Sequence, residues 1–189
     1  MKVKDIIISA ADQLGLDETV EYLKNDVAAD TNARESEVNK LLGAFNLTMA
    51  DICSDYCPLV RSVCFSDTDG ILFSNVRDSI VEIVSVTDGE GKNIDFENRV
   101  SEIRLNGRYD RVILTYSYMP DARELDDDCD YAEGKPITSR ALALGTAAEY
   151  LRLTGAYDHA SRWAEKFESS LRACMRPKGK IVMPKRRWL

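Results

Sequence analysis

Residues 138–175 read TSRALALGTAAEYLRLTGAYDHASRWAEKFESSLRACM. Their apolar residues recur every three or four positions, which predicts two helices, 138–154 and 158–175. Gly155 ends the first helix, because glycine readily takes the backbone conformation that closes one. We expect the following side chains to form the core of this helical hairpin: Leu144, Leu151, Tyr157, Trp163, Phe167 and Leu171.

The N-terminal region predicts three further helices. An apolar stripe at helical spacing stops at Gly15, and Asp17 can cap a second, shorter helix. Asn32, with a glutamate three residues later, is a capping arrangement for a third and longer helix. This helix must end before Pro58, because the residue that precedes a proline disfavours the helical conformation.

Between these two helical regions the apolar spacing changes to every second residue, which is typical of strands. The predicted strands are 59–67, 71–74, 80–87, 94–96, 101–105 and 111–118. Asp69-Gly70, the segment 88–91 and Asn106-Gly107 carry the residues that close hairpins. We therefore expect a small antiparallel sheet or open barrel with one face on a core.

These elements predict an α+β fold: a helical bundle built from N- and C-terminal helices, with an inserted antiparallel β subdomain. The predicted parts are N-terminal helices, a β insertion, an acidic linker, a helical hairpin and a basic tail. Their bounds are 1–57, 58–119, 120–136, 137–175 and 176–189.

Charge is unevenly distributed along the chain. The last part, 176–189, carries six Lys and Arg residues and no acid. Since the whole chain has 25 Lys and Arg against 32 Asp and Glu, residues 1–175 hold 19 basic and 32 acidic side chains, a net charge of about −13. Such segregation concerns partners and solubility rather than fold, and it draws attention to the tail.

Composition narrows the class of protein. With 44% apolar and 30% charged residues, the chain is expected to be globular, with no membrane partner. Its start lacks the apolar stretch of a signal peptide, so we expect a cytoplasmic origin. Five dispersed cysteines and a single histidine favour reduced thiols over disulfides or a structural metal, and no cofactor is expected.

No motif in the chain points to catalysis. A nucleophile elbow, a His-Glu-x-x-His pair and a glycine-rich phosphate loop are all absent from the sequence, so we do not expect an enzyme. The acidic run 124–130 lacks the pattern of a calcium loop and is interpreted as a solvated linker. His159 starts a predicted helix and is interpreted as a surface or capping residue.

The tail allows three interpretations. Its cations and Trp188 could bind nucleic acid, since Lys and Arg neutralise phosphates and an indole stacks on bases. It could instead dock in a groove of a protein partner, or be a solvated end without a role. The apolar run Ile181-Val182-Met183 among the cations favours docking, because apolar anchors and arginines dominate many interfaces.

The C-terminal region also resembles a known family. The hairpin carries Ala-Ala-Glu-Tyr, Thr-Gly-Ala-Tyr and Ala-Ser-Arg-Trp, followed by Phe and Leu-Arg, and it leads to a Met-Pro-x-Arg-Arg-Trp tail. Together with the order of elements, this pattern resembles the head-to-tail adaptor (connector) proteins of tailed bacteriophages, including the tail tubular protein A type. The Gly-x-Tyr-x-x-Ala turn at 155–160 also resembles a tetratricopeptide unit, but the chain has no second copy.

The resemblance implies a structural protein of the virion neck, made in the host cytoplasm. Such adaptors form a ring, usually a dodecamer, between the portal protein and the tail (nozzle or tube) protein, and duplex DNA passes through it without sequence-specific binding. In this family the C-terminal arm commonly reaches the portal. The corresponding residues here are Arg176, Ile181, Met183, Arg186, Arg187, Trp188 and Leu189.

Two alternatives stay open at this point. One is a nucleic-acid-binding accessory protein, whose affinity for a duplex would fall steeply with salt. The other is a non-viral scaffold module built on the helical hairpin.

Overall fold

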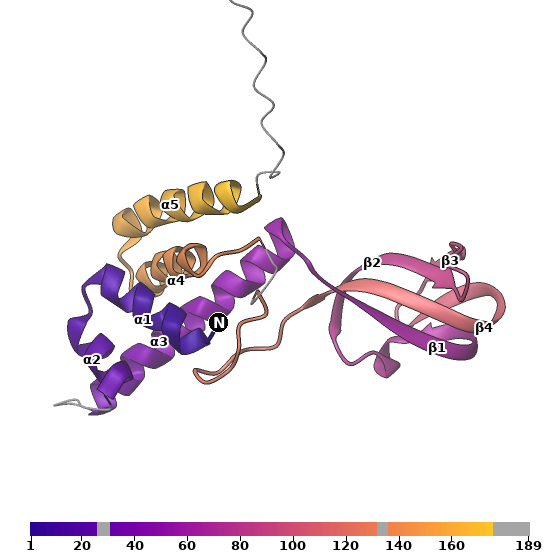
Figure 1. Cartoon of the computed structure of the whole chain (residues 1–189), viewed down its shortest axis with the longest axis horizontal. Helices are drawn as coiled ribbons and strands as arrows, with labels where there is room; N and C mark the ends of the chain where they lie inside the picture. The colour runs from indigo at the N-terminus through magenta and orange to yellow at the C-terminus, as the bar shows by residue number, and fades with distance from the viewer. Residues whose placement is uncertain (26–30, 132–135, 176–189) are drawn as a thin grey trace, which may run out of the picture.

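The computed structural model describes residues 1–25, 31–131 and 136–175. It confirms the predicted α+β fold, with a helical domain and a β domain that lie end to end (Figure 1). The described helices are α1 Val3–Leu14, α2 Asp17–Asn25, α3 Thr31–Asp51, α4 Ser139–Leu153 and α5 Tyr157–Met175. The strands are β1 Leu59–Leu72, β2 Ser79–Asp88, β3 Phe96–Asn98 and β4 Glu102–Met119.

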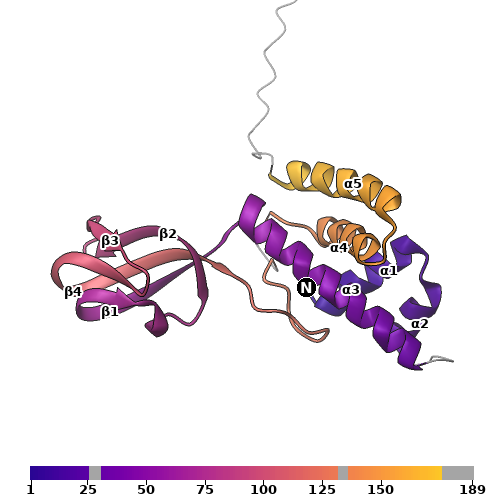
Figure 2. The ribbon, with the colours of Figure 1, turned by 180° about the vertical axis from the view of Figure 1, so that it is seen from behind.

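Both ends of the sequence contribute to the helical domain. Helix α4 packs against α1, α3 and α5, and it lies between α5 and the N-terminal helices (Figures 1 and 2). Residues 141–148 of α4 are all buried, so this stretch of the helix has no exposed face. A helix buried on all sides needs no one-sided apolar stripe. The fold therefore needs α4 as the central helix of a core that begins more than a hundred residues earlier.

Gly145 marks the point where α3, α4 and α5 come closest. A Cβ atom at this position would overlap Cγ2 of Thr48 on α3 and lie 2.9 Å from Cε2 of Phe167 on α5. Thr48 is fully buried, and its hydroxyl donates a hydrogen bond to the Ala44 carbonyl 2.9 Å away. The absence of a side chain at Gly145 thus permits the spacing of three helices.

Most helix ends follow the predicted signals. Gly15 and Gly155 take positive φ angles of 73° and 82° after α1 and α4. Thr138 caps α4, accepting a hydrogen bond from the Ala141 N–H at 3.3 Å. Asn32 lies inside α3 rather than at its cap, and α3 continues into a π-helical turn, Ile52–Tyr56, before Pro58.

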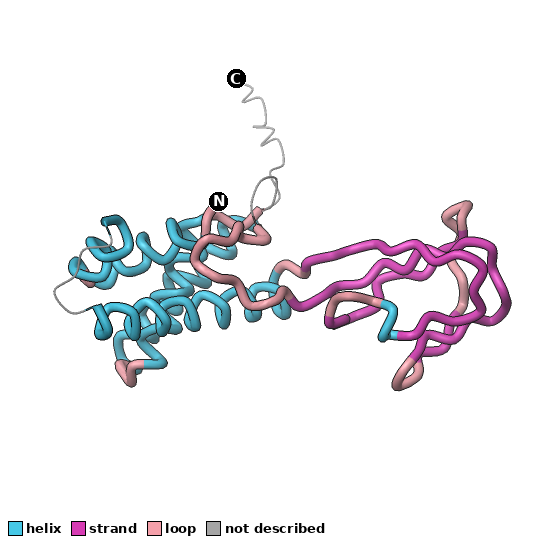
Figure 3. The backbone as a smooth tube through the Cα atoms, turned by 90° about the horizontal axis from the view of Figure 1, so that it is seen from below, coloured by secondary structure: helices cyan, strands magenta, loops and turns pink. Residues whose placement is uncertain are grey.

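The sheet of the β domain is antiparallel, with the order β1–β4–β2, and β3 pairs with the first residues of β4. The predicted turn at 88–91 is present, because Gly91 has φ 83° and its N–H donates to the Asp88 carbonyl at 3.1 Å. Figure 3 shows the two long strands, β1 and β4, leaving the helical domain side by side.

The two other predicted hairpin turns are wrong. Strand β1 continues through Asp69-Gly70, where the register with β4 shifts between Thr68 and Gly70. Strand β4 likewise continues through Asn106-Gly107. Gly70 is still paired with Arg104 of β4, so the ladder of hydrogen bonds resumes beyond the irregularity. Turn-forming dipeptides therefore make a bulge and a bend in long strands here, and six predicted strands become four.

Two separate clusters of buried side chains stabilise the molecule. One is formed by the helices and includes Leu59, the first residue of β1. The other lies inside the β domain and includes Val112, Leu114 and Tyr116, which alternate along β4 as their spacing predicts. Tyr118 packs against both clusters, so one side chain bridges the two cores.

Candidate functional site

The residues predicted to dock on a portal lie outside the described residues. They are Arg176, Ile181, Met183, Arg186, Arg187, Trp188 and Leu189. The chain enters this tail from Met175, the last residue of α5. That end of α5 lies on the side of the helical domain that faces the β domain (Figures 1 and 2).

The expected core of the helical hairpin is only partly buried. Leu144 and Leu171 are buried, with exposed fractions of 6% and 0%. Phe167 packs against the core with part of its surface exposed, and Leu151 and Trp163 are half-buried. Tyr157 is 68% exposed, which contradicts its expected place in the core. Helix α5 packs on α4 alone among the principal contacts, so its first residue extends past the covered surface.

The acidic segment, defined here as residues 120–131, is packed on the helical domain and is not the solvated linker expected from its charge. Its backbone pairs with the N-terminus: the Val3 N–H donates to the Asp127 carbonyl at 3.1 Å, and the Cys129 N–H donates to the Met1 carbonyl at 2.9 Å. Lys2 forms an ion pair with Asp128 at 3.1 Å. These hydrogen bonds and the ion pair therefore fix the acidic segment against residues 1–3.

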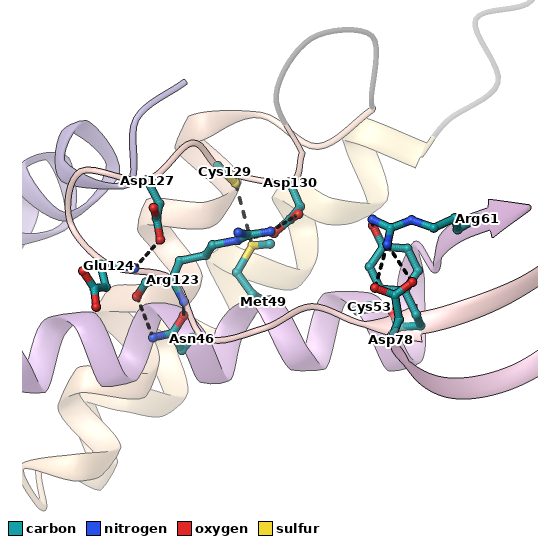
Figure 4. Close-up of polar contacts among 11 residues, drawn as sticks. Asn46, Met49, Cys53, Arg61, Asp78, Arg123, Glu124, Asp127, Cys129 and Asp130 are labelled. Carbon is teal, nitrogen blue, oxygen red and sulfur yellow. Dashed lines mark hydrogen bonds and ion pairs between the residues drawn. The ribbon is translucent and has the colours of Figure 1, made fainter. Parts of the chain in front are cut away.

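Asn46 and Arg123 fasten the acidic segment to α3 (Figure 4). The Asn46 amide donates to the Arg123 carbonyl at 3.2 Å and accepts from the Arg123 N–H at 2.9 Å. The Arg123 guanidinium donates to both carboxylate oxygens of Asp130, at 2.9 and 2.5 Å. These hydrogen bonds raise the pKa of Arg123 and close the segment into a loop. The sequence offered one signal for this arrangement, a single arginine within an acidic run.

The junction between the two domains is fixed by polar contacts as well as by packing. The Cys53 thiol lies 3.0 Å from the Tyr118 carbonyl of β4, to which it donates (Figure 4 labels Cys53). Tyr131, which is buried, donates its hydroxyl to the Cys57 carbonyl at 2.5 Å. Burial raises the pKa of Tyr131 far above its usual value, so the phenol stays a donor. The Cys53 contact thus joins the end of the helical domain to β4, and the Tyr131 contact joins the acidic segment to the residue that precedes Pro58 and β1.

A second polar group stiffens the base of the β domain. Arg61 of β1 donates to both carboxylate oxygens of Asp78, at 2.6 and 2.7 Å, and its guanidinium lies 4.6 Å from the ring centre of Tyr118 (Figure 4 shows the Arg61–Asp78 pair). Tyr116 donates to the same carboxylate at 2.7 Å. Burial, together with this hydrogen bond, raises the pKa of Tyr116 to about 12.

The outer strand β2 borders a groove in the β domain. The groove encloses about 680 Å³, and its lining includes Phe73, Val81 and Phe96. Val81 and Val84 of β2 are 51% and 55% exposed. An outer strand with exposed valines is a surface on which another chain can pair.

A second groove, between α4 and α5, is lined by cations. It encloses about 630 Å³, and its lining includes Arg140 of α4 with Arg162 and Lys166 of α5. The Lys166 ammonium lies 4.3 Å from the ring centre of Trp163. Trp163 thus contacts one of the cations that line this groove, and it is only partly buried in the hairpin.

Within 1–25, 31–131 and 136–175 there is no group of three or more His, Cys, Asp or Glu placed to hold a metal ion. His159 is exposed at the start of α5, and the five cysteines are not joined in disulfides. No helix in the described ranges is both long and apolar enough to cross a membrane.

Comparison with known proteins adds no assignment. The sequence matches no known protein-family model, and no curated protein matches it either.

Proposed function

We propose that this chain is a structural virion protein, a head-to-tail adaptor that forms a ring between the portal protein and the tail protein. In this proposal it acts in the virion neck, is made in the host cytoplasm and continues the channel through which duplex DNA passes. The resemblance of its hairpin and tail to phage adaptors suggests the family. The layout of the molecule supplies independent support.

The observation that carries the proposal is the end-to-end arrangement of two domains, each with its own core, around a fastened junction. An adaptor must contact one assembly at one end and a second assembly at the other. The two domains are joined by the contact of Cys53 with Tyr118 and by the Tyr118 side chain, which packs against both cores. A molecule with two surfaces at its two ends suits such a role.

Charge supports the same proposal. Residues 1–175 carry a net charge of about −13, and like charge prevents a duplex from adhering to a channel wall. The tail has the opposite sign and contains apolar anchors, as a peptide that docks on another protein requires. The proposed partners are therefore the portal, the tail protein, further copies of this chain, and passing DNA.

The proposal is tested by measuring the mass of complexes formed with the cognate portal ring. The full chain should load the ring with about one copy per portal subunit, and a chain ending at Met175 should not. Trp188→Ala should reduce loading strongly, because an apolar anchor is lost. Lys178→Ala, which removes one cation from the same tail, serves as the matched control and should reduce loading only slightly.

A full chain that ignores the portal would refute this proposal. If such a chain retarded duplex DNA, with an affinity that fell steeply with salt, the nucleic-acid interpretation of the tail would replace it.

A further inference from the structure

The cations of the α4–α5 groove stand out because they have no carboxylate partners. Elsewhere, exposed arginines are mostly paired: Arg99 with Glu97, Arg108 with Asp67, and Arg172 with Glu168. Among the described residues, no ion pair involves Arg140, Arg162 or Lys166, although all three line one groove. These three cations outnumber the one carboxylate of the same lining, Glu165, and this excess of positive charge favours an anionic occupant.

The acidic segment presents the complementary charges. Asp121, Glu124 and Asp126 are exposed, and their carboxylates form no ion pair within the described part of the chain. The backbone that carries them is already held by Asn46 and by the chain start. Because this loop is ordered before it meets a partner, little conformational entropy remains to be lost on binding.

The groove and the acidic segment cannot satisfy each other within one molecule. Helix α5 lies on one side of the helical domain, and the acidic segment lies on the opposite side (Figures 1 and 2). Figure 3, which views the molecule from the side opposite α5, shows the segment in front of the helices. Two different complementary patches on opposite sides produce a head-to-tail contact, which closes into a ring when the rotation per copy allows it.

We propose that the α4–α5 groove of one copy binds the acidic segment of a second copy, through Arg140, Arg162 and Lys166 on one side and Asp121, Glu124 and Asp126 on the other. This inference rests on the proposed function, since it assigns the contact that builds the ring. Each ion pair at a solvated surface is weak by itself, so the contact depends on several charges acting together and should be strongest at low salt.

The observations favour a second copy over nucleic acid as the occupant. The groove also contains Glu165, and Glu168 lies one residue before Ser169 of the same lining. A duplex that followed the groove would bring its phosphates against these carboxylates. A short loop with three carboxylates can contact the three cations without extending along the rest of α5.

The test uses two charge-reversed full-length chains. The groove-reversed chain carries Arg140→Glu and Lys166→Glu, and the loop-reversed chain carries Glu124→Lys and Asp126→Lys. All four positions are exposed, so both chains should fold. Arg77→Glu with Lys92→Glu makes the same change in charge in the β domain, at two exposed positions, and is the matched control for the groove.

Self-association is measured by sedimentation velocity at roughly 0.05 M salt, where the Debye length exceeds 10 Å. The wild type and the control should associate, whereas each reversed chain alone should associate at least about tenfold more weakly. A mixture of the two reversed chains should regain association, because each groove then meets a loop of opposite charge. A monomeric wild type, or a mixture that stays monomeric, overturns the proposal.

Two further outcomes separate this inference from its alternatives. If the groove-reversed chain loses binding to a short duplex that the wild type binds, while its self-association is unchanged, the groove is a nucleic-acid site and the inference is wrong. If both reversed chains load the portal ring as fully as the wild type does, the inference fails while the adaptor function stands. If the mixed chains associate but neither they nor the wild type load the portal, the contact between copies stands and the adaptor function fails.

Discussion

Replacing Gly145 by alanine brings two opposite effects into competition. Alanine is the better helix former, worth about 1 kcal/mol in a helix interior, so propensity alone predicts a more stable protein. The structure predicts the opposite. The new methyl group would overlap Cγ2 of Thr48 and lie 2.9 Å from the Phe167 ring. Thr48 is fully buried and hydrogen-bonded to Ala44, so it has little room to move.

The expected net effect of Gly145→Ala is a loss of stability. Overpacking a buried contact typically costs about 1–3 kcal/mol, which exceeds the gain in helix propensity. Because the new methyl group overlaps the buried Thr48 directly, the cost falls in the upper part of that range, about 2–3 kcal/mol. After the gain in propensity is subtracted, the net loss is about 1–2 kcal/mol, which lowers Tm by roughly 2–8 °C for a chain of this length. Phe167 can relieve part of the overlap, because its ring is partly exposed. Thr48 is therefore the main source of the cost.

Urea unfolding followed by circular dichroism measures this effect directly. Gly43→Ala is the matched control: Gly43 is an exposed residue inside α3, a Cβ atom there would meet nothing within 4 Å, and the variant should gain up to about 1 kcal/mol. Thr48→Ser removes the clashing methyl group, so in that background Gly145→Ala should cost about 1 kcal/mol less. A Gly145→Ala protein as stable as the wild type would refute the proposed close approach of α3, α4 and α5.

Because the tail is proposed to dock on a partner, deleting residues 176–189 should leave Tm nearly unchanged in scanning calorimetry, and a large fall in Tm would make the tail part of the core. In urea titrations Leu171→Ala should lower the free energy of unfolding by about 2–5 kcal/mol, because this side chain is fully buried. Trp163→Ala should lower it clearly less, because Trp163 is only half-buried, and equal losses would contradict this difference in burial. Asn46→Ala removes two hydrogen bonds to the acidic segment and should speed limited proteolysis there, with unchanged cleavage as the contrary result. Burial opposes the ionisation of Glu37, but its hydrogen bonds and a nearby arginine outweigh this and lower its pKa below 4.5. The stabilisation by Glu37 is therefore present above pH 4.5 and is lost as the pH falls through the lowered pKa, so Glu37→Gln should flatten the pH dependence of unfolding below about pH 4.5.

The sequence predicts the fold class and most helix ends because those signals are local. Gly15 ends α1 and Thr138 begins α4 through contacts within a single helical turn, so both signals can be recognised from a few neighbouring residues. The alternation along β4 is equally local, and Val112, Leu114 and Tyr116 face the core that it predicts. Each of these features is determined by residues within about five positions of one another.

The predictions fail where contacts between residues far apart in the sequence determine the structure. Asn106-Gly107 closes a hairpin only if the chain reverses there, but β4 continues through it and pairs with β1 on both sides, at Arg104 and at Tyr109. The acidic segment was predicted to be solvated because charged residues outnumber apolar ones in its sequence. Asn46 lies 77 positions from Arg123, and no local pattern reveals that pairing. Tyr157 was expected to pack in the turn between α4 and α5, but it is the first residue of α5 and is 68% exposed.

The insertion of the β domain has a consequence for the order of folding during synthesis. The helical core needs residues from both ends of the chain and cannot form until α4 and α5 have left the ribosome. The β core uses only residues between Val63 and Tyr118, and it can form earlier. Its formation pairs Leu59 with Tyr118, which brings the two helical halves together before they dock. The early-folding insertion thereby closes the intervening loop in advance and lowers the entropic cost of joining α3 to α4.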